Sequence, residues 1–92
     1  MTKSDLIERL SESNIELTKR DAETIVNSIF DSIGDALVGG DRVEIRGFGS
    51  FTVRERDSRD ARNPKSGELV RIPAKKTPFF KTGKELRERV DV

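Results

Sequence analysis

The chain has 92 residues, of which 33% are hydrophobic and 38% charged, and its formal net charge is +1. A chain of this length fits one small domain, and so little apolar material leaves a meagre core for a lone copy, so we expect a partner chain. The absence of Cys and His excludes disulfides, thiolate- or imidazole-ligated metals and imidazole acid–base chemistry. No apolar run approaches the length of a signal sequence or a membrane span, and we expect a cytoplasmic protein.

The near-zero net charge hides two parts of opposite sign. Residues 1–41 carry four Lys or Arg against nine Asp or Glu, a net charge of −5. Residues 42–87 carry thirteen against six, a net charge of +7, and residues 88–92 add −1. This asymmetry indicates either a polyanion partner for the second part or a solvated segment that charge keeps soluble.

Two helices are predicted first. Thr2-Lys3-Ser4-Asp5 is a capping-box pattern, and apolar residues on one helical face follow it until about Ser13-Asn14. A second capping box begins at Thr18 and precedes a longer helix that Gly39-Gly40 ends. Its apolar residues recur every three or four positions and make a broad stripe for a core and a dimer interface: Ala22, Ile25, Val26, Ile29, Phe30, Ile33 and Leu37.

Strands are predicted next. Residues 42–46 alternate, with Val43 and Ile45 inward, and residues 47–50 form a tight turn. The following strand points Phe51 and Val53 inward, and the apolar alternation then stops, so the chain leaves the core. It returns through residues 69–72 to Pro78-Phe79-Phe80, and a short last helix opens at Thr82 or Gly83.

Between these strands, residues 59–67 contain nothing apolar that is larger than Ala61 or Pro64. Asn63 and Pro64 suit the first turn positions, and Gly67 can adopt the positive φ that closes such a loop. Flanking segments 50–62 and 68–80 favour strands, so we predict one long two-stranded ribbon with Pro64 near its tip. Each limb could reach about 40 Å, longer than such a domain is wide, so the tip projects.

Basic residues follow this ribbon, as they would follow a phosphate backbone. The ribbon carries Arg54, Arg56, Arg59, Arg62, Lys65, Arg71, Lys75 and Lys76, and Lys81, Lys84 and Arg87 lie close to its base. No aromatic residue follows Phe51 on the outward limb to stack on single-stranded bases, so the pattern favours a duplex. Pro64 is either a turn former or an apolar wedge between base pairs.

Catalysis is not indicated by these residues. A nucleophile needs an adjacent base, and the acidic residues occur among Lys and Arg on solvated faces. Gly47-Phe48-Gly49 joins two strands and opens no helix, so it is not a phosphate loop. We predict a protein that is not an enzyme and that needs no metal or cofactor.

Four motifs together resemble the HU/integration host factor family of bacterial DNA-bending proteins, and the likeness covers the whole chain. They are Gly47-Phe48-Gly49-Ser50-Phe51, Arg62-Asn63-Pro64-Lys65-Ser66-Gly67, Pro78-Phe79-Phe80-Lys81 and Gly83-Lys84-Glu85-Leu86. The resemblance implies an α+β intertwined dimer: two N-terminal helices, a three-stranded antiparallel sheet with a protruding β-arm, and a short C-terminal helix. It also implies that two arms wrap the minor groove of double-stranded DNA and that Pro64 intercalates.

The resemblance divides the single domain 1–92 into three parts. Residues 1–41 would form the helical dimerisation part, residues 42–82 the sheet and DNA-binding arm with its tip near 63–67, and residues 83–92 the C-terminal helix. Asn63 and Lys65 at the tip would contact DNA beside Pro64.

Within the family, residues 1–10 and 42–46 look most like the beta subunit of integration host factor. There the residues matching Glu44 and Arg46 form a pair at the DNA surface that contributes sequence preference, and Arg42 is a further candidate DNA contact. Lys3, Lys81 and Lys84 match phosphate contacts of the family. Departures from the pattern place Ser66 where Thr is usual, Ala61 where Gly is common, and the acids Asp57 and Asp60 on the arm.

The resemblance therefore implies an architectural protein of the bacterial nucleoid that bends double-stranded DNA in transcription, replication and recombination. Its partner would be an alpha-type chain. An HU-like homodimer with little sequence preference is the alternative within the family. A ribbon that pairs with another protein's sheet edge is the alternative from another class.

Overall fold

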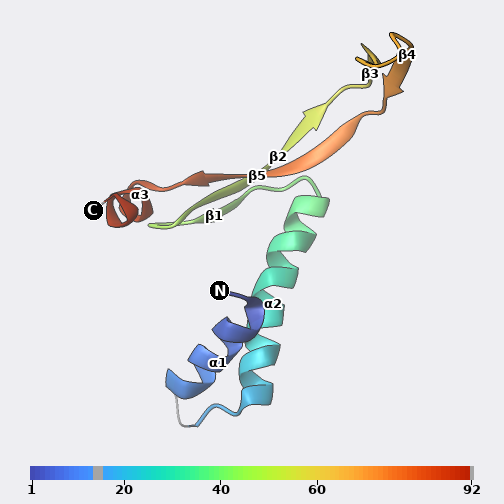
Figure 1. Cartoon of the computed structure of the whole chain (residues 1–92). Coiled ribbons are helices and arrows are strands. Elements are labelled where there is room, and N and C mark those ends of the chain that lie inside the picture. The colour runs from blue at the N-terminus through green and yellow to red at the C-terminus, as the bar shows by residue number, and fades with distance from the viewer. Residues whose placement is uncertain (14–15, 92) are drawn as a thin grey trace.

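The computed structural model describes residues 1–13 and 16–91 of the chain (Figure 1). Three helices and five strands follow one another in an α+β order, as predicted. They are α1 (Lys3–Ser13), α2 (Lys19–Val38), β1 (Val43–Ile45), β2 (Gly49–Arg56), β3 (Arg59–Arg62), β4 (Leu69–Ile72), β5 (Lys75–Thr82) and α3 (Lys84–Val90). Asn14, near the predicted end of the first helix, and Val92, in the C-terminal part, lie outside the described residues.

Both predicted capping boxes are present. The Thr2 amide donates to Asp5 Oδ2 at 2.8 Å, and the Asp5 amide donates to Thr2 Oγ1 at 3.3 Å. Thr18 and Asp21 repeat this exchange at 3.4 and 3.1 Å. Each box satisfies two amides that have no partner inside the helix, which is why both helices begin where the sequence predicts.

The sheet joins β1, β2 and β5 in that order, with antiparallel neighbours. Phe80 packs against Phe48 and Phe51, with ring centroids 5.5 and 4.8 Å apart. A Cβ at Gly49 would lie 2.6 Å from the ring of Phe80 and 2.5 Å from the carbonyl oxygen of Lys81. Only glycine therefore fits where the second strand begins.

The core of this single chain is very small. Among the described residues the only buried hydrophobic side chains are those of Ile7, Ala22 and Val26, with Leu10 and Leu17 packed beside them. The radius of gyration is 19.2 Å, whereas a compact chain of this length has about 12 Å. Ala22 and Val26 belong to the stripe of α2, but other residues of the stripe face solvent, with Ile29 53% and Phe30 50% exposed, so much of the expected core is unburied.

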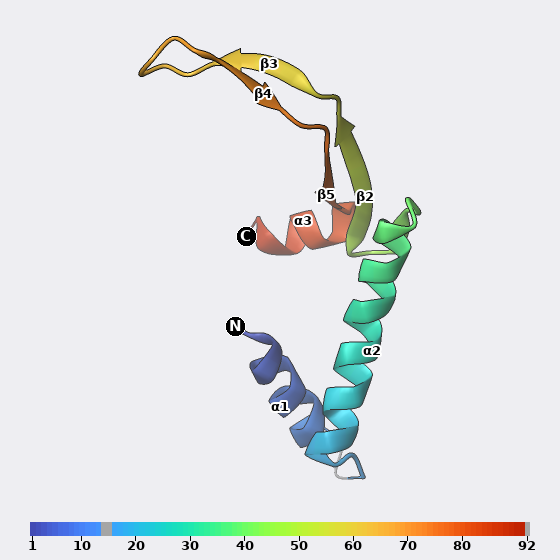
Figure 2. The same cartoon turned by 90° about the vertical axis from the view of Figure 1, so that its right-hand side faces the viewer.

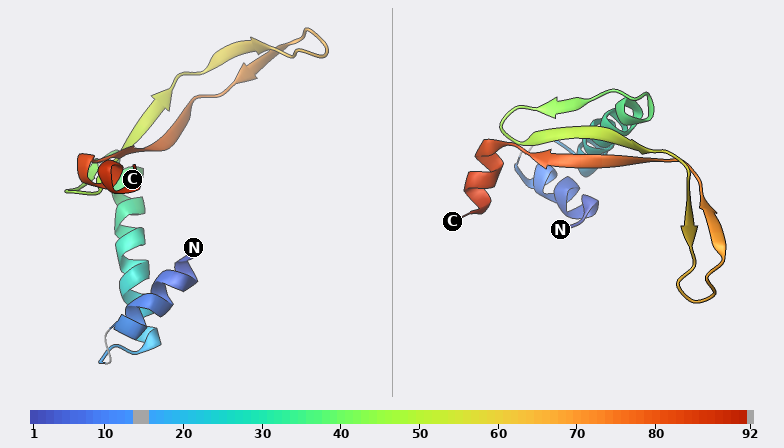
Figure 3. Two further views of the ribbon diagram at one scale, coloured as in Figure 1. Left: turned by 60° about the vertical axis from the view of Figure 1, so that its left-hand side comes forward. Right: turned by 90° about the horizontal axis from the view of Figure 1, so that it is seen from above.

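The predicted long two-stranded ribbon is present, and it consists of two ladders with a break that the sequence analysis did not predict. Pairing of β2 with β5 ends at Arg56 and Lys75, and pairing of β3 with β4 begins at Arg59 and Ile72. We call residues 57–58 and 73–74, which lie between the ladders, the elbow. There the arm turns sharply (Figures 2 and 3), and Pro73, which has no N–H to donate, accounts for the lost pairing.

Candidate nucleic-acid interface

Strand register assigns the ribbon's cations to faces. Val53 and Pro78 are paired and line a hollow against α2, so their side of the β2–β5 ladder is its helix side. Because side chains alternate along a strand, the residues at the positions in between point to the opposite side of the ladder, which we call the outer face. The predicted outward direction of Arg54 and Arg56 agrees with this register. The outer face carries Arg54, Arg56, Lys75 and Lys81.

Lys76 lies on the other side of the ribbon. It is paired with Glu55 across the ladder, and Lys76 Nζ lies 3.5 Å from Glu55 Oε1. It also lines the apolar hollow of about 400 Å³ between the ribbon and α2. The structure therefore does not bring Lys76 together with the cations of the outer face.

Arg54 makes a contact that the sequence analysis missed. Its guanidinium carbon lies 3.4 Å from the ring centroid of Phe79, a cation–π stack. We grouped Phe79 with Pro78 and Phe80 as an apolar segment returning to the sheet, but alternation turns Phe79 outward. The ring holds the Arg54 side chain against the outer face, where the charge remains exposed.

Acidic and basic side chains lie together at the end of the sheet where the turn joins β1 to β2, which we call the foot of the sheet. A hollow of about 270 Å³ is lined by Arg42, Glu44, Arg46 and Lys81, among other residues. Arg42 Nη2 lies 3.8 Å from Glu44 Oε2, and register places Glu44 opposite Ser50 on the outer face. The predicted group of Arg42, Glu44 and Arg46 is thus assembled beside Lys81.

The last helix lies next to this foot. The Gly83 amide donates to the Phe48 carbonyl at 2.8 Å and so ties the start of α3 to the first turn of the sheet. Lys84 Nζ lies 3.9 Å from Glu88 Oε1 one turn further along, and Arg87 is exposed. Lys3 begins α1 in the helical part, away from the ribbon (Figure 1).

The tip is the predicted turn. The Asn63 amide donates to the Glu68 carbonyl at 2.9 Å, and the Gly67 amide donates to the Asn63 carbonyl at 2.7 Å. Gly67 has a φ of 74°, in the left-handed region that favours glycine. Pro64 lies inside this loop and is exposed, so its ring can contact a ligand.

Cations of the tip hairpin occupy both of its faces. Register pairs Arg59 with Ile72 on one face, which Ala61 and Val70 continue. The remaining tip cations lie elsewhere: Arg62 and Arg71 on the other face, and Lys65 in the loop. The predicted row of positive charge is therefore continuous along the base of the ribbon but divided beyond the elbow.

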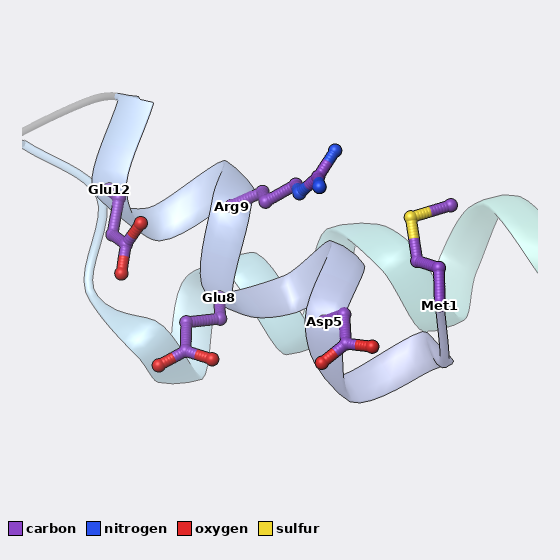
Figure 4. A pocket seen from close by; sticks show the side chains of 5 residues that line it. All are labelled: Met1, Asp5, Glu8, Arg9 and Glu12. Carbon is purple, nitrogen blue, oxygen red and sulfur yellow. The ribbon is translucent and has the colours of Figure 1, made fainter.

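An acidic surface lies on the helical part of the chain. Asp5, Glu8 and Glu12 line a shallow hollow of about 450 Å³ on α1, and Figure 4 shows Arg9 directed away from the Glu8 carboxylate. The spacing of three and four residues places these carboxylates along one helical face. A polyanion would be repelled here, which leaves the ribbon and the sheet as the faces it can approach.

In the described part of the chain, no group of three or more Asp or Glu is arranged to hold a metal ion, and no polar or charged residue is buried. No helix among these residues is long and apolar enough to span a membrane.

The family pattern described as "Bacterial DNA-binding protein" matches residues 1–91. The chain belongs to this family. The family is one of DNA-binding proteins rather than of enzymes, and the match covers both the helical part and the arm.

Solved structures of HU proteins resemble the chain along its whole length. HU from Anabaena, solved in a cocrystal with DNA, is 40% identical, with a TM-score of 0.83 over 98% of this chain and 97% of that one. A mutant of HU from Thermotoga maritima is 33% identical, with a TM-score of 0.70 over 98% and 99%. The HU of Thermotoga maritima itself is 31% identical, with a TM-score of 0.65 over 98% of each chain.

These likenesses confirm the predicted family and fold. They are to HU proteins, so the finer prediction of an integration host factor beta subunit gains no support from them. Sequence reasoning missed the elbow and the outward Phe79. Pro73 was available as a signal for the elbow, and side chains alternate along a strand, so the neighbours Phe79 and Phe80 could not both face inward.

Proposed function

We propose that this protein is an HU-like architectural protein that, as a homodimer, bends double-stranded DNA in the bacterial nucleoid. The observation that carries this proposal is the projecting ribbon, with cations on its outer face and an exposed proline in its tip loop. Similarity to an HU protein solved together with DNA supports it.

A second copy of the chain would complete the core. Several exposed apolar residues lie on α2, next to the helix-side hollow that Gly34, Leu37 and Val53 help to line. Two copies that cover each other's stripes would remove this surface from water, at about 25 cal/mol per Å². The dimer would carry two arms, and two arms can hold one duplex from both sides.

On that duplex, the cationic surface and the tip loop would make different contacts. Cations of the outer face and of the α3 start would neutralise phosphates, while Pro64 would enter the minor groove and unstack a base step. Unstacking costs a few kcal/mol and is offset by the extra protein surface that bent DNA contacts, as is established for minor-groove benders of this family.

Lys84→Gln is expected to weaken binding to all duplexes alike and to flatten its salt dependence. Each lost phosphate contact lowers the slope of log K against log salt by about 0.9, so two symmetric copies would lose about 1.8. Mobility-shift titrations between about 50 and 200 mM salt measure this slope.

Lys19→Gln is the matched control, since Lys19 is an equally charged, exposed lysine at the start of α2, far from the ribbon. It should leave the slope unchanged. An altered sequence preference with the original slope in Lys84→Gln would contradict the phosphate role.

A second candidate is an integration host factor beta-like subunit that pairs with an alpha-type chain. The observation in its favour is the Arg42–Glu44 pair beside Arg46 on the outer face, because a fixed carboxylate among arginines can discriminate between bases or groove shapes.

Glu44→Ala tests this candidate. A beta-like subunit should lose discrimination between its preferred site and a random duplex, by roughly 1–3 kcal/mol for each base pair read. Glu55→Ala, on the helix side of the ribbon, is the control. An HU-like homodimer predicts unchanged preference in both variants and a single species at twice the monomer mass.

The competing class is a ribbon that adds to another protein's sheet. Titration with duplex DNA, single-stranded DNA and RNA separates these classes, because DNA bending requires a clear preference for duplex DNA. Equal, weak binding to all three nucleic acids would favour the protein-interaction ribbon.

A further inference from the structure

The elbow keeps its strand register although its pairing is lost. The ladders end at Arg56–Lys75 and resume at Arg59–Ile72, so two residues on each strand separate them and no bulge is inserted. Ser58 would face Pro73 in an unbroken ladder, and proline has no amide hydrogen to donate there. The two strands at this point therefore need another connection.

Arg71 provides such a connection. Its Nη2 donates to Ser58 Oγ at 3.0 Å, and its Nη1 lies 3.7 Å from Asp60 Oδ1. Asp60 is also the cross-strand partner of Arg71. The guanidinium, with its two forked donors, thus reaches from the fourth strand to the elbow and to the third strand at once.

We propose that Arg71 is a positioning residue that ties the elbow through Ser58 and Asp60 and sets the direction in which the tip hairpin, with Pro64, leaves the ribbon. The elbow is where the arm changes direction (Figure 3). In this role Arg71 is not a phosphate contact, and Asp60 is the counter-ion that helps to hold it. The expected effect of Arg71 on DNA bending rests on the proposed function, whereas its expected effect on the orientation of the free arm does not.

The proposed role of Arg71 explains why an acidic residue, Asp60, lies on an arm that is proposed to bind DNA, a polyanion. On charge alone, Asp60 would repel phosphate, and its removal would tighten binding. As the counter-ion of Arg71 in the elbow tie, Asp60 has the opposite effect, because its removal loosens the arm. The sign of the change in affinity therefore separates the two accounts.

Asp60→Asn and Asp57→Asn form a matched pair for this test. Each removes one negative charge from the same stretch of arm, but Asp57 takes part in none of the ion pairs of the described residues. Asp60→Asn should weaken binding to a duplex by about two- to fivefold, the range for an exposed pair, and reduce its bend. Asp57→Asn should bind as tightly as the wild type or more tightly.

Two further variants test whether the guanidinium geometry of Arg71, rather than its charge, is required. Ser58→Ala removes one acceptor without a change of charge, and Arg71→Lys keeps the charge but loses the fork. We expect both to reduce the bend, and neither to lower the salt dependence of binding. Full bending with Arg71→Lys, or tighter binding with Asp60→Asn, would overturn the proposal.

A measurement without DNA completes the test. Residual dipolar couplings of backbone amides in the full-length free protein report how firmly residues 59–72 are oriented relative to β2 and β5. These couplings should shrink in Ser58→Ala, Asp60→Asn and Arg71→Lys, and stay at the wild-type values in Asp57→Asn. Unchanged couplings in the first three, or couplings near zero in the wild type, would overturn the tie. If neither the wild type nor any variant binds duplex DNA, the proposed function is wrong. The couplings of the free proteins would still decide the role of Arg71.

Discussion

Phe30→Asp is expected to abolish the folded dimer and, with it, DNA binding. Phe30 and Ile29 are half-exposed on α2 in the single chain, which buries only three apolar residues among those described. In the proposed dimer each copy would bury an unpaired carboxylate, which costs several kcal/mol per ion. We expect the dissociation constant of the dimer to rise at least about 100-fold, since each 1.4 kcal/mol changes an equilibrium constant by a factor of ten.

Analytical ultracentrifugation and far-ultraviolet circular dichroism measure this result. Ser28→Asp is the control, because Ser28 lies on the opposite side of the same helix and is exposed. It places the same charge two residues away and should leave the dimer intact. A dimeric, helical Phe30→Asp protein would show that this stripe is not the interface.

Pro64→Ala is expected to reduce DNA bending far more than it reduces stability. The loop keeps its backbone hydrogen bonds through Asn63 and Gly67, so the hairpin should still close. Loss of the ring removes the wedge, and a base step that costs a few kcal/mol to unstack is no longer held open. We expect affinity for a linear duplex to fall by roughly tenfold or more.

Pro64→Leu separates the wedge from the turn. Leucine keeps apolar bulk, and it serves as a wedge in other minor-groove proteins, but it does not fix φ. A wedge role predicts that Pro64→Leu retains much of the bend. If Pro64→Ala and Pro64→Leu were equally impaired and thermal melting showed a disordered hairpin, only the turn role would remain.

Local signals in the sequence were enough to predict the helices and the tip. Capping boxes at Thr2 and Thr18 and the Asn63-Pro64 turn act through neighbouring residues, so they need no knowledge of the rest of the fold. The point at which the chain leaves the core, after Val53, was also readable from the end of the apolar alternation. These elements appear where they were predicted.

Predictions that depended on strand pairing succeeded less well. Lys76 was grouped with the other ribbon cations, and only its pairing with Glu55 reveals that it lies on the helix side. The elbow has a local cause in Pro73, but its tie through Arg71 joins residues thirteen positions apart. Such a contact follows from register, which composition and spacing do not determine.

The shape of DNA bound by the wild-type protein is the most direct test of the proposed bending. Fluorescence resonance energy transfer between dyes at the two ends of a short duplex reports their distance. If the protein bends DNA with a Pro64 wedge, transfer should rise as the protein saturates the duplex, and Pro64→Ala at saturation should give a much smaller rise. Saturated binding by the wild-type protein with no increase in energy transfer would contradict the proposed bending.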